Sequence, residues 1–227
     1  VTHAGVLLFA RREVLARCCP QAQFHYVLHD SETTVARNDI DRLPLLEAVE
    51  RMEQVFVGPL NPEREIELGL FKLRIPQYPI EGVREAVLNA LTHRDYLNPG
   101  EILVRHSAQE LVVTSPGGFV AGITPENILR HEAVPRNRTL ANALVKLRLV
   151  ESSGIGRRRI FRSALVYGKR RPQYQTDGYT VTLRLFNRET HSAVAQVAAR
   201  LDAAGAVVTL DHLLVLDALV GQSFMDV

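Results

Sequence analysis

The sequence has no tryptophan, few other aromatic residues and only two cysteines. Cys18 and Cys19 are adjacent, and adjacent cysteines very rarely bond to each other. Neither a disulfide framework nor a cysteine-based zinc site is therefore expected, which favours a cytoplasmic protein. No run approaches about 18 uninterrupted apolar residues, so no membrane span is predicted. The N-terminus lacks a starting Met and a basic leader, which indicates a fragment of a longer protein with no signal peptide.

The composition predicts a soluble globular protein with more than one module. The chain has 227 residues, of which 46% are hydrophobic and 23% charged. The net charge is only +2, but it is unevenly distributed: residues 30–67 hold ten acids and four arginines, whereas residues 157–171 hold seven basic residues and no acid. This basic run predicts either a solvated face with a phosphate-binding end or a direct contact with nucleic acid.

The most informative stretch is residues 81–96, for which the spacing predicts an amphipathic helix. Five apolar residues share one face at 100° per residue: Val83, Ala86, Val87, Ala90 and Leu91. Glu85, Asn89, Thr92 and His93 fall on the other face, which we expect to be exposed. Because Glu85 and Asn89 are one turn apart, their oxygens can converge on a water molecule and a hydrated cation. Such a pair is also ordinary on a solvated helix surface, so the choice between a binding site and plain surface depends on the neighbouring motifs.

The rest of the pattern alternates short strands with helices. Strands are expected at 23–28, 65–75, 101–105, 110–115 and 179–186, and helices at 41–57, 124–129, 138–149 and 157–168. Proline and glycine at 58–62 predict a domain boundary near residues 56–64. Two further helices, from about residues 191 and 209, could begin a winged-helix module or form a dimer arm. Their sequence pattern fits both alternatives equally.

Two glycine loops follow these elements. Ser115-Pro-Gly-Gly-Phe119 comes directly after a predicted strand, and Glu151-Ser-Ser-Gly-Ile-Gly156 precedes the arginine-rich helix. Glycine permits positive φ angles and close backbone approach, and the free N–H groups at a helix start attract anions. A phosphate site or a plain turn would account for the second loop.

Together these motifs resemble the N, G1 and G2 boxes of GHKL (Bergerat-fold) ATPases. More closely, residues 85–96, the Ser-Pro-Gly-Gly loop, Pro135-Arg-Asn137 and residues 151–156 resemble bacterial transcriptional regulators often labelled ATP-dependent DNA helicase-like. The resemblance implies an α+β fold with a central two-layer GHKL-like ATP-binding domain at 61–190. It also implies the C-terminal part of a Schlafen-type Alba DNA-binding domain at 1–60 and the start of a winged helix at 191–227.

The resemblance also implies roles for individual residues. Glu85 corresponds to the general base, and Asn89 to the amide that holds Mg²⁺ against the phosphates of ATP. Gly154 and Gly156 would lie against the phosphates, and Ser115, Gly117 and Gly118 on the adenine side. The nucleotide-binding set is completed by His93, Arg136 and Asn137. DNA would be bound through the flanking modules, and a homodimer is a further expectation.

The chain departs from the parent pattern in the first glycine loop. Ser115 stands where GHKL proteins have an aspartate that accepts from adenine, and Phe119 replaces the last glycine. Loss of a charge-assisted hydrogen bond costs roughly 1.5–3 kcal/mol. A degenerate scaffold or dimerisation module is therefore the alternative to a nucleotide sensor. Since the sequence lacks a Gly-x-x-x-x-Gly-Lys-Ser/Thr loop, motor helicase activity is not expected.

Overall fold

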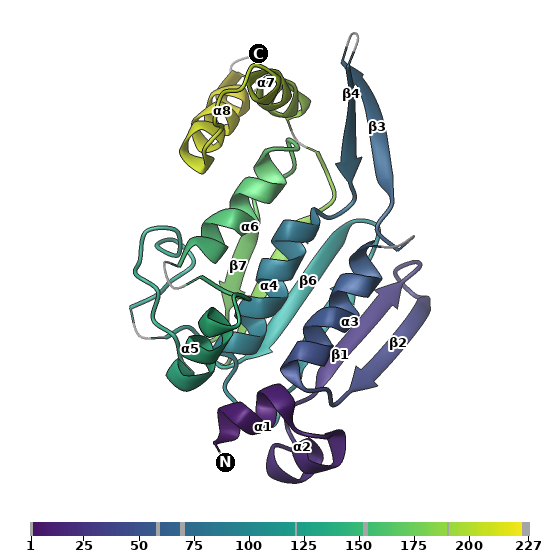
Figure 1. The fold of residues 1–227 in the computed structure, drawn as a ribbon. Coiled ribbons are helices and arrows are strands. Elements are labelled where there is room, and N and C mark those ends of the chain that lie inside the picture. Colours follow the sequence, from purple (N-terminus) through teal and green to yellow (C-terminus); the bar gives the residue numbers. More distant parts are fainter. Residues whose placement is uncertain are drawn as a thin grey trace.

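A six-stranded mixed sheet with helices on one face forms the body of the protein (Figure 1). The computed structural model describes residues 2–57, 60–68, 71–120, 122–151, 154–189 and 191–223. The strand order is β2-β1-β5-β6-β8-β7. These strands are β1 (Phe24–His29), β2 (Val35–Asp41), β5 (Ile102–His106), β6 (Glu110–Pro116), β7 (Gln173–Thr176) and β8 (Thr180–Phe186). The predicted α+β class is confirmed.

Four helices make up the second layer: α3 (Leu45–Val57), α4 (Ile80–His93), α5 (Arg138–Lys146) and α6 (Ile155–Leu165). Helix α4 lies at the centre, between α3 and α6 (Figure 1). Its apolar face, which includes Val83 and Val87, is buried against the sheet, as its spacing predicts. On the opposite face, Glu85 and Thr92 are buried and Asn89 and His93 are half-buried, and α6 packs against this side of α4, so the expectation that the face is exposed is wrong.

The first 57 residues belong to the same body. After α1 (His3–Phe9) and α2 (Arg12–Cys18), strand β1 pairs in parallel with β5, from Phe24 opposite Ile102 to Leu28 opposite His106. One continuous hydrophobic core extends from Val6 to residues of β8. The boundary expected near residues 56–64 therefore does not separate two cores.

A two-stranded hairpin projects from this body, formed by β3 (Glu63–Leu68) and β4 (Phe71–Pro76) (Figure 1). The prediction of one strand over 65–75 is wrong, because two strands occupy this stretch. The apolar positions change from 66, 68 and 70 to 71, 73 and 75, and this change of phase was the overlooked signal. Glu65 is paired with Lys72 and Arg74 across the two strands. The short helix predicted at 124–129 is also absent: these residues form turns, in which Asn127 Oδ1 accepts from the Thr124 N–H.

The two C-terminal helices, α7 (Ser192–Ala203) and α8 (Leu210–Ser223), pack on α6 at the end of the molecule opposite the N-terminus (Figure 1). They enclose a separate small core that includes Phe161, Leu165, Val194 and Leu213. Both helices occur where the sequence predicts them. Among the described residues, no helix is long and apolar enough to cross a membrane.

Candidate functional site

A cavity of about 240 Å³ opens between α4, the end of β6, the segment 117–136 and the start of α6. It brings together eight of the predicted site residues: Glu85, Asn89, His93, Ser115, Gly117, Gly118, Gly154 and Gly156. These residues are separated by up to 71 positions in the sequence, so the shared cavity is the main support for reading the motifs as one site.

The cavity has an apolar part and a polar part. Aliphatic side chains line most of the wall, from the sheet, from the segment 117–136 and from α5: Val113, Val181, Leu183, Val120, Ile123, Ile128, Val134 and Val145. Charged groups join it where α4 meets α6, namely Glu85, Glu151 and Arg157. Binding sites for small ligands commonly combine a predominantly apolar wall with a few polar groups in this way.

Glu85 is nearly buried, at 5% exposure, although its helical position suggested a solvent-facing residue. Its Oε1 accepts from Arg159 Nη1 at 3.1 Å. Arg159 also pairs with Glu151, and its Nε lies 3.8 Å from Glu81. Both carboxylate partners raise the pKa of the Arg159 guanidinium. A buried carboxylate requires such a partner, because an unpaired charge in the interior is strongly unfavourable.

Gly156 allows α6 to approach α4 closely. A Cβ atom at this position would overlap Glu85 Oε2, and it would lie 3.7 Å from Asn89 Nδ2. Further along the same contact, a Cβ atom at Gly82 would overlap the Ser163 hydroxyl. Gly154 has φ +68°, the left-handed region that favours glycine. The second glycine loop is therefore explained in part by helix packing, and its residues Ser152 and Ser153 lie outside the described residues.

Asn89 has a polar atom with no partner. Its Nδ2 is buried and makes no hydrogen bond, whereas buried amides are normally paired. The amide oxygen and nitrogen of an asparagine are assigned by their surroundings, so either atom can be turned toward a ligand. A buried amide that lines a cavity and has no partner in the protein fits a residue that hydrogen-bonds to a ligand.

Ser115 and His93 provide uncharged polar groups. Ser115 Oγ donates to the Ala90 carbonyl at 3.1 Å, so only its lone pairs remain for a ligand. Burial, with the neighbouring charges of Arg157 and Arg136, lowers the pKa of His93 to about 4. His93 is therefore neutral at physiological pH, so its imidazole carries no positive charge into the cavity.

Two predicted site residues hold the wall instead of lining the cavity. Arg136 donates from Nε to the His93 carbonyl at 3.0 Å and from Nη2 to the Gly118 carbonyl at 2.5 Å. Asn137 Nδ2 donates to the carbonyls of Thr92 and Arg94 at 2.9 and 2.8 Å. Both side chains thus satisfy carbonyls at the C-terminal end of α4, which no helical N–H can reach.

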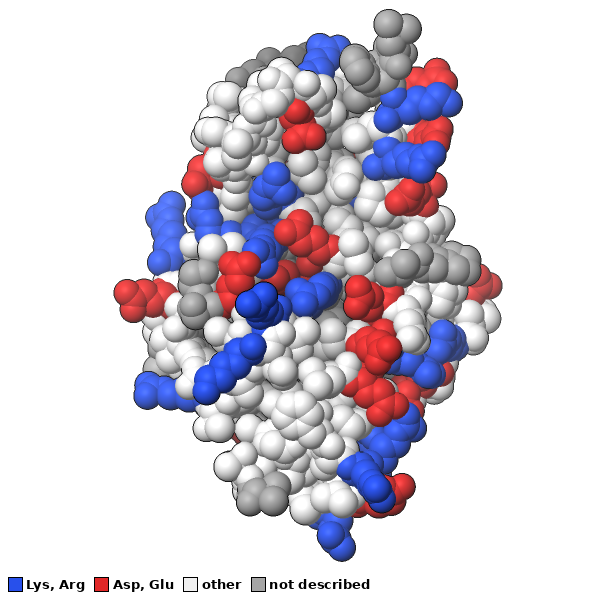
Figure 2. All heavy atoms as spheres, viewed as in Figure 1, with Lys and Arg blue, Asp and Glu red and all other residues white. Residues whose placement is uncertain are grey.

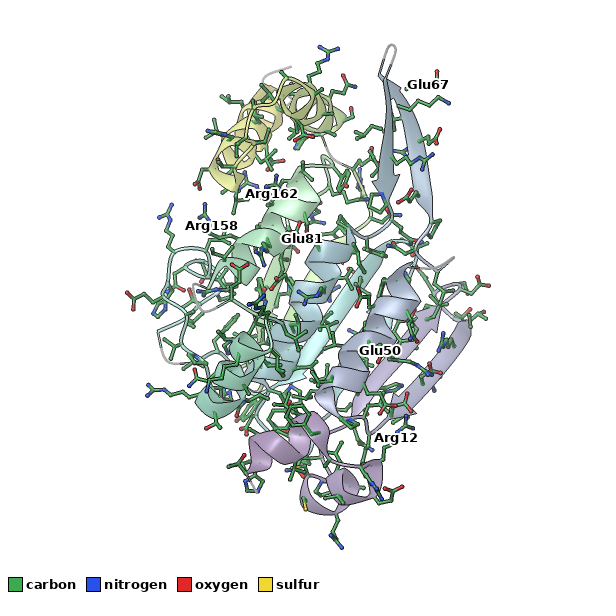
Figure 3. The ribbon with its side chains drawn as sticks, viewed as in Figure 1. Arg12, Glu50, Glu67, Glu81, Arg158 and Arg162 are labelled. Atoms are coloured by element: carbon green, nitrogen blue, oxygen red, sulfur yellow. The ribbon has the colours of Figure 1, made fainter. Side chains whose placement is uncertain are left out.

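The arginine-rich stretch is engaged within the protein. Arg157 donates to the His131 carbonyl, Arg158 to Asp211 of α8, and Arg162 to the Val208 carbonyl. Arg158 and Arg162 lie along the side of α6 that faces the C-terminal helices (Figure 3). On the face in Figure 2, basic and acidic side chains are interspersed. These contacts weaken the prediction that the run binds nucleic acid directly.

Sequence reasoning missed Arg157, Glu151 and Tyr174 as residues of the cavity wall. Arg157 follows Gly156 directly, so its place at the start of α6 was a usable signal. Tyr174 lies in β7, a strand that the sequence did not predict, and its ring stacks on Phe161 with a centroid distance of 6.4 Å. Within the described ranges, no group of three or more His, Cys, Asp or Glu side chains could hold a metal ion.

A family match covers the part of the cavity that the two glycine loops supply, whereas Glu85, Asn89 and His93 lie before the matched residues. Residues 100–185 match the family described as "Putative ATP-dependent DNA helicase recG C-terminal". The structure is similar to that of the DIP2311 protein from Corynebacterium diphtheriae, with a TM-score of 0.73 and 28% sequence identity over 86% of this chain. The match covers 39% of the DIP2311 chain, so this chain corresponds to about two fifths of that protein. The search of curated proteins found no match.

Proposed function

We propose that the cavity binds ATP together with Mg²⁺ and that the protein is a nucleotide-responsive regulator. The observation that supports this proposal most is the unpartnered Asn89 amide, in a cavity that unites residues of three separate sequence motifs. The match to an ATP-dependent family over residues 100–185 supports the same ligand class.

Each part of the cavity suits one part of the nucleotide. The aliphatic wall next to Ser115 accommodates the base, whose exocyclic amine can donate to the free lone pairs of the Ser115 hydroxyl. The start of α6 and Arg157 provide the positive end for the phosphates, through free backbone N–H groups and the guanidinium.

Binding of the phosphates at the start of α6 would require a cation. Glu85 and Glu151 would repel the phosphates of a nucleotide bound alone. Mg²⁺ commonly uses one or two protein ligands together with substrate phosphates and water, so the Asn89 amide oxygen suffices without a cluster of carboxylates. Bound there, Mg²⁺ would neutralise phosphate charge, and we assign to Glu85 the role of accepting a proton from water.

The output of the nucleotide site would be the C-terminal helices. They pack through a small apolar core on α6, the helix whose first turn lines the cavity, and Arg162 of α6 donates to the Val208 carbonyl. We assign DNA binding to modules that flank the nucleotide site, with α7 and α8 as part of one of them.

Isothermal titration with a non-hydrolysable ATP analogue, with and without Mg²⁺, tests the proposal. Saturable binding that requires Mg²⁺ and disappears in Asn89→Ala is expected. As a control, Asn142→Ala changes another amide on the cavity wall, one that is exposed, and should retain binding. Absence of binding at millimolar analogue would favour a scaffold or dimerisation module whose glycine loops serve only packing.

A further inference from the structure

We propose that Arg159 is a positioning residue that restrains Glu85 and keeps nucleotide hydrolysis slow. This inference rests on the proposed function, because Glu85 can act as a base only if the cavity binds the nucleotide. Arg159 is on α6, Glu85 is on α4, and the guanidinium joins the two helices at the polar end of the cavity.

The contacts occupy the Glu85 carboxylate on both sides. Oε1 accepts a charge-assisted hydrogen bond from Arg159 at 3.1 Å. Oε2 faces the backbone of Gly156, where not even a Cβ atom would fit. Because the side chain is almost buried, water competes poorly with either contact. The carboxylate is therefore both neutralised and fixed in place.

Arg159 is itself held by more than one acid. It pairs with Glu151, which precedes α6 and lines the cavity, and its Nε lies 3.8 Å from Glu81. Glu81 is at the start of α4 (Figure 3). Two acceptors fix the planar guanidinium better than one, since its donors are arranged as a rigid fork. The residues that line the cavity include Glu85 and Glu151 but not Arg159, so Arg159 acts through Glu85 and not on the ligand.

The consequence for hydrolysis follows from the proton balance. The oxygen of water bonds to the terminal phosphorus, the bond from that phosphorus to the bridging oxygen breaks, and a nucleoside diphosphate leaves. The proton that the water loses must be accepted by Glu85. A carboxylate oxygen that already accepts from a guanidinium is not free to accept from the attacking water, so this transfer is slow while Arg159 remains in place.

The test compares Arg159→Gln with the parent chain in steady-state phosphate release and in titration with the non-hydrolysable analogue. We expect kcat to rise about tenfold, which is less than the roughly 10²–10⁴-fold that a positioned general base contributes, while the dissociation constant of the analogue changes less than about threefold. Arg158→Gln is the matched control, because Arg158 is the adjacent residue of α6 and pairs instead with Asp211. It should change neither quantity.

Two further variants keep the outcome decisive. Arg159→Lys retains the charge but cannot bridge two carboxylates as a guanidinium does, so it should raise kcat by a smaller factor. If Arg159→Gln does not fold, the kcat of Arg159→Lys tests the inference in its place. In the double variant Arg159→Gln with Glu85→Gln, the gain should vanish, because the base that Arg159 restrains is no longer present. An unchanged or lower kcat in both single variants, with analogue binding intact, overturns the inference. Absence of analogue binding in the parent chain overturns the proposed function itself.

Discussion

Tyr26 and His106 join β1 to β5 in the core, with 2.7 Å between Tyr26 Oη and His106 Nδ1. Phe56 and Tyr78 pack against the same imidazole, with centroid distances of 5.0 and 5.3 Å. The residues of this cluster come from both sides of the boundary expected near 56–64. The N-terminal part and the cavity-bearing part are therefore packed as one unit.

Acid should weaken the fold through His106. Burial lowers the pKa of His106 to about 4, whereas an unfolded histidine has a pKa of about 6.5. The unfolded state thus binds more protons between these values, so stability is present above pH 6.5 and is lost as the pH falls toward 4. The loss amounts to about 3 kcal/mol.

Urea unfolding at intervals from pH 7 to pH 4 measures this loss. His106→Gln keeps a polar partner for Tyr26 but cannot titrate, so its stability should fall less steeply with acid. His93 titrates in the same range and contributes to the remaining slope. If the free energy of unfolding fell equally with pH in His106→Gln and in the parent chain, His106 would not be the source of the acid sensitivity.

Replacement of Arg94 by methionine should destabilise the fold by about 2–4 kcal/mol, because buried carbonyls would lose their donor. Arg94 is fully buried and donates to the carbonyls of Gln21, Gln23 and Gly100. Arg74→Met is the control, since Arg74 is 70% exposed and its ion pair is worth less than about 1 kcal/mol. If thermal or urea unfolding gave the same loss of stability in Arg94→Met and Arg74→Met, the buried contacts of Arg94 would not be what stabilises the fold.

Introduction of a methyl group at Gly156 should abolish binding of the ATP analogue and cost about 1–3 kcal/mol of stability. The reason is steric, because the added Cβ atom would displace Glu85 or separate α6 from α4. Gly5→Ala tests the same substitution in α1, where the nearest atom is 3.5 Å away, and should leave binding unchanged. Titration and thermal unfolding of both variants provide the comparison, and normal binding by Gly156→Ala would argue against the close contact.

Loss of the Asp217 charge should loosen α8. Asp217 Oδ2 accepts from Arg171 Nε at 2.5 Å, and Oδ1 lies 3.7 Å from His191 Nε2. In Asp217→Asn we expect amide hydrogens of α8 to exchange about tenfold faster, while those of α4 keep their parent rates. Asp211→Asn is the control, because Asp211 is 71% exposed and its pair with Arg158 is screened by water. Unchanged exchange in both variants would mean that apolar packing alone holds α8.

The sequence by itself determined the local elements whose spacing is regular. Apolar periodicity predicted α4, α7 and α8, and alternation predicted β1, β5, β6 and β8, each within a few residues of its observed bounds. The division between β3 and β4 was missed because a change of phase in the alternation, from even to odd apolar positions after residue 70, was overlooked. Strand β7 was missed because four residues show too little periodicity.

Only the tertiary structure decided what the site residues do. Helical spacing put Glu85 and Asn89 on one face, but whether that face met water depended on α6, which begins about 70 residues later. Likewise, the arginine-rich stretch showed a charge that could bind nucleic acid, whereas its partners in α4 and α8 are set by the packing of distant helices. Periodicity is a property of neighbouring residues, but burial and charge pairing depend on which surface packs against them, and that is decided only when the chain folds.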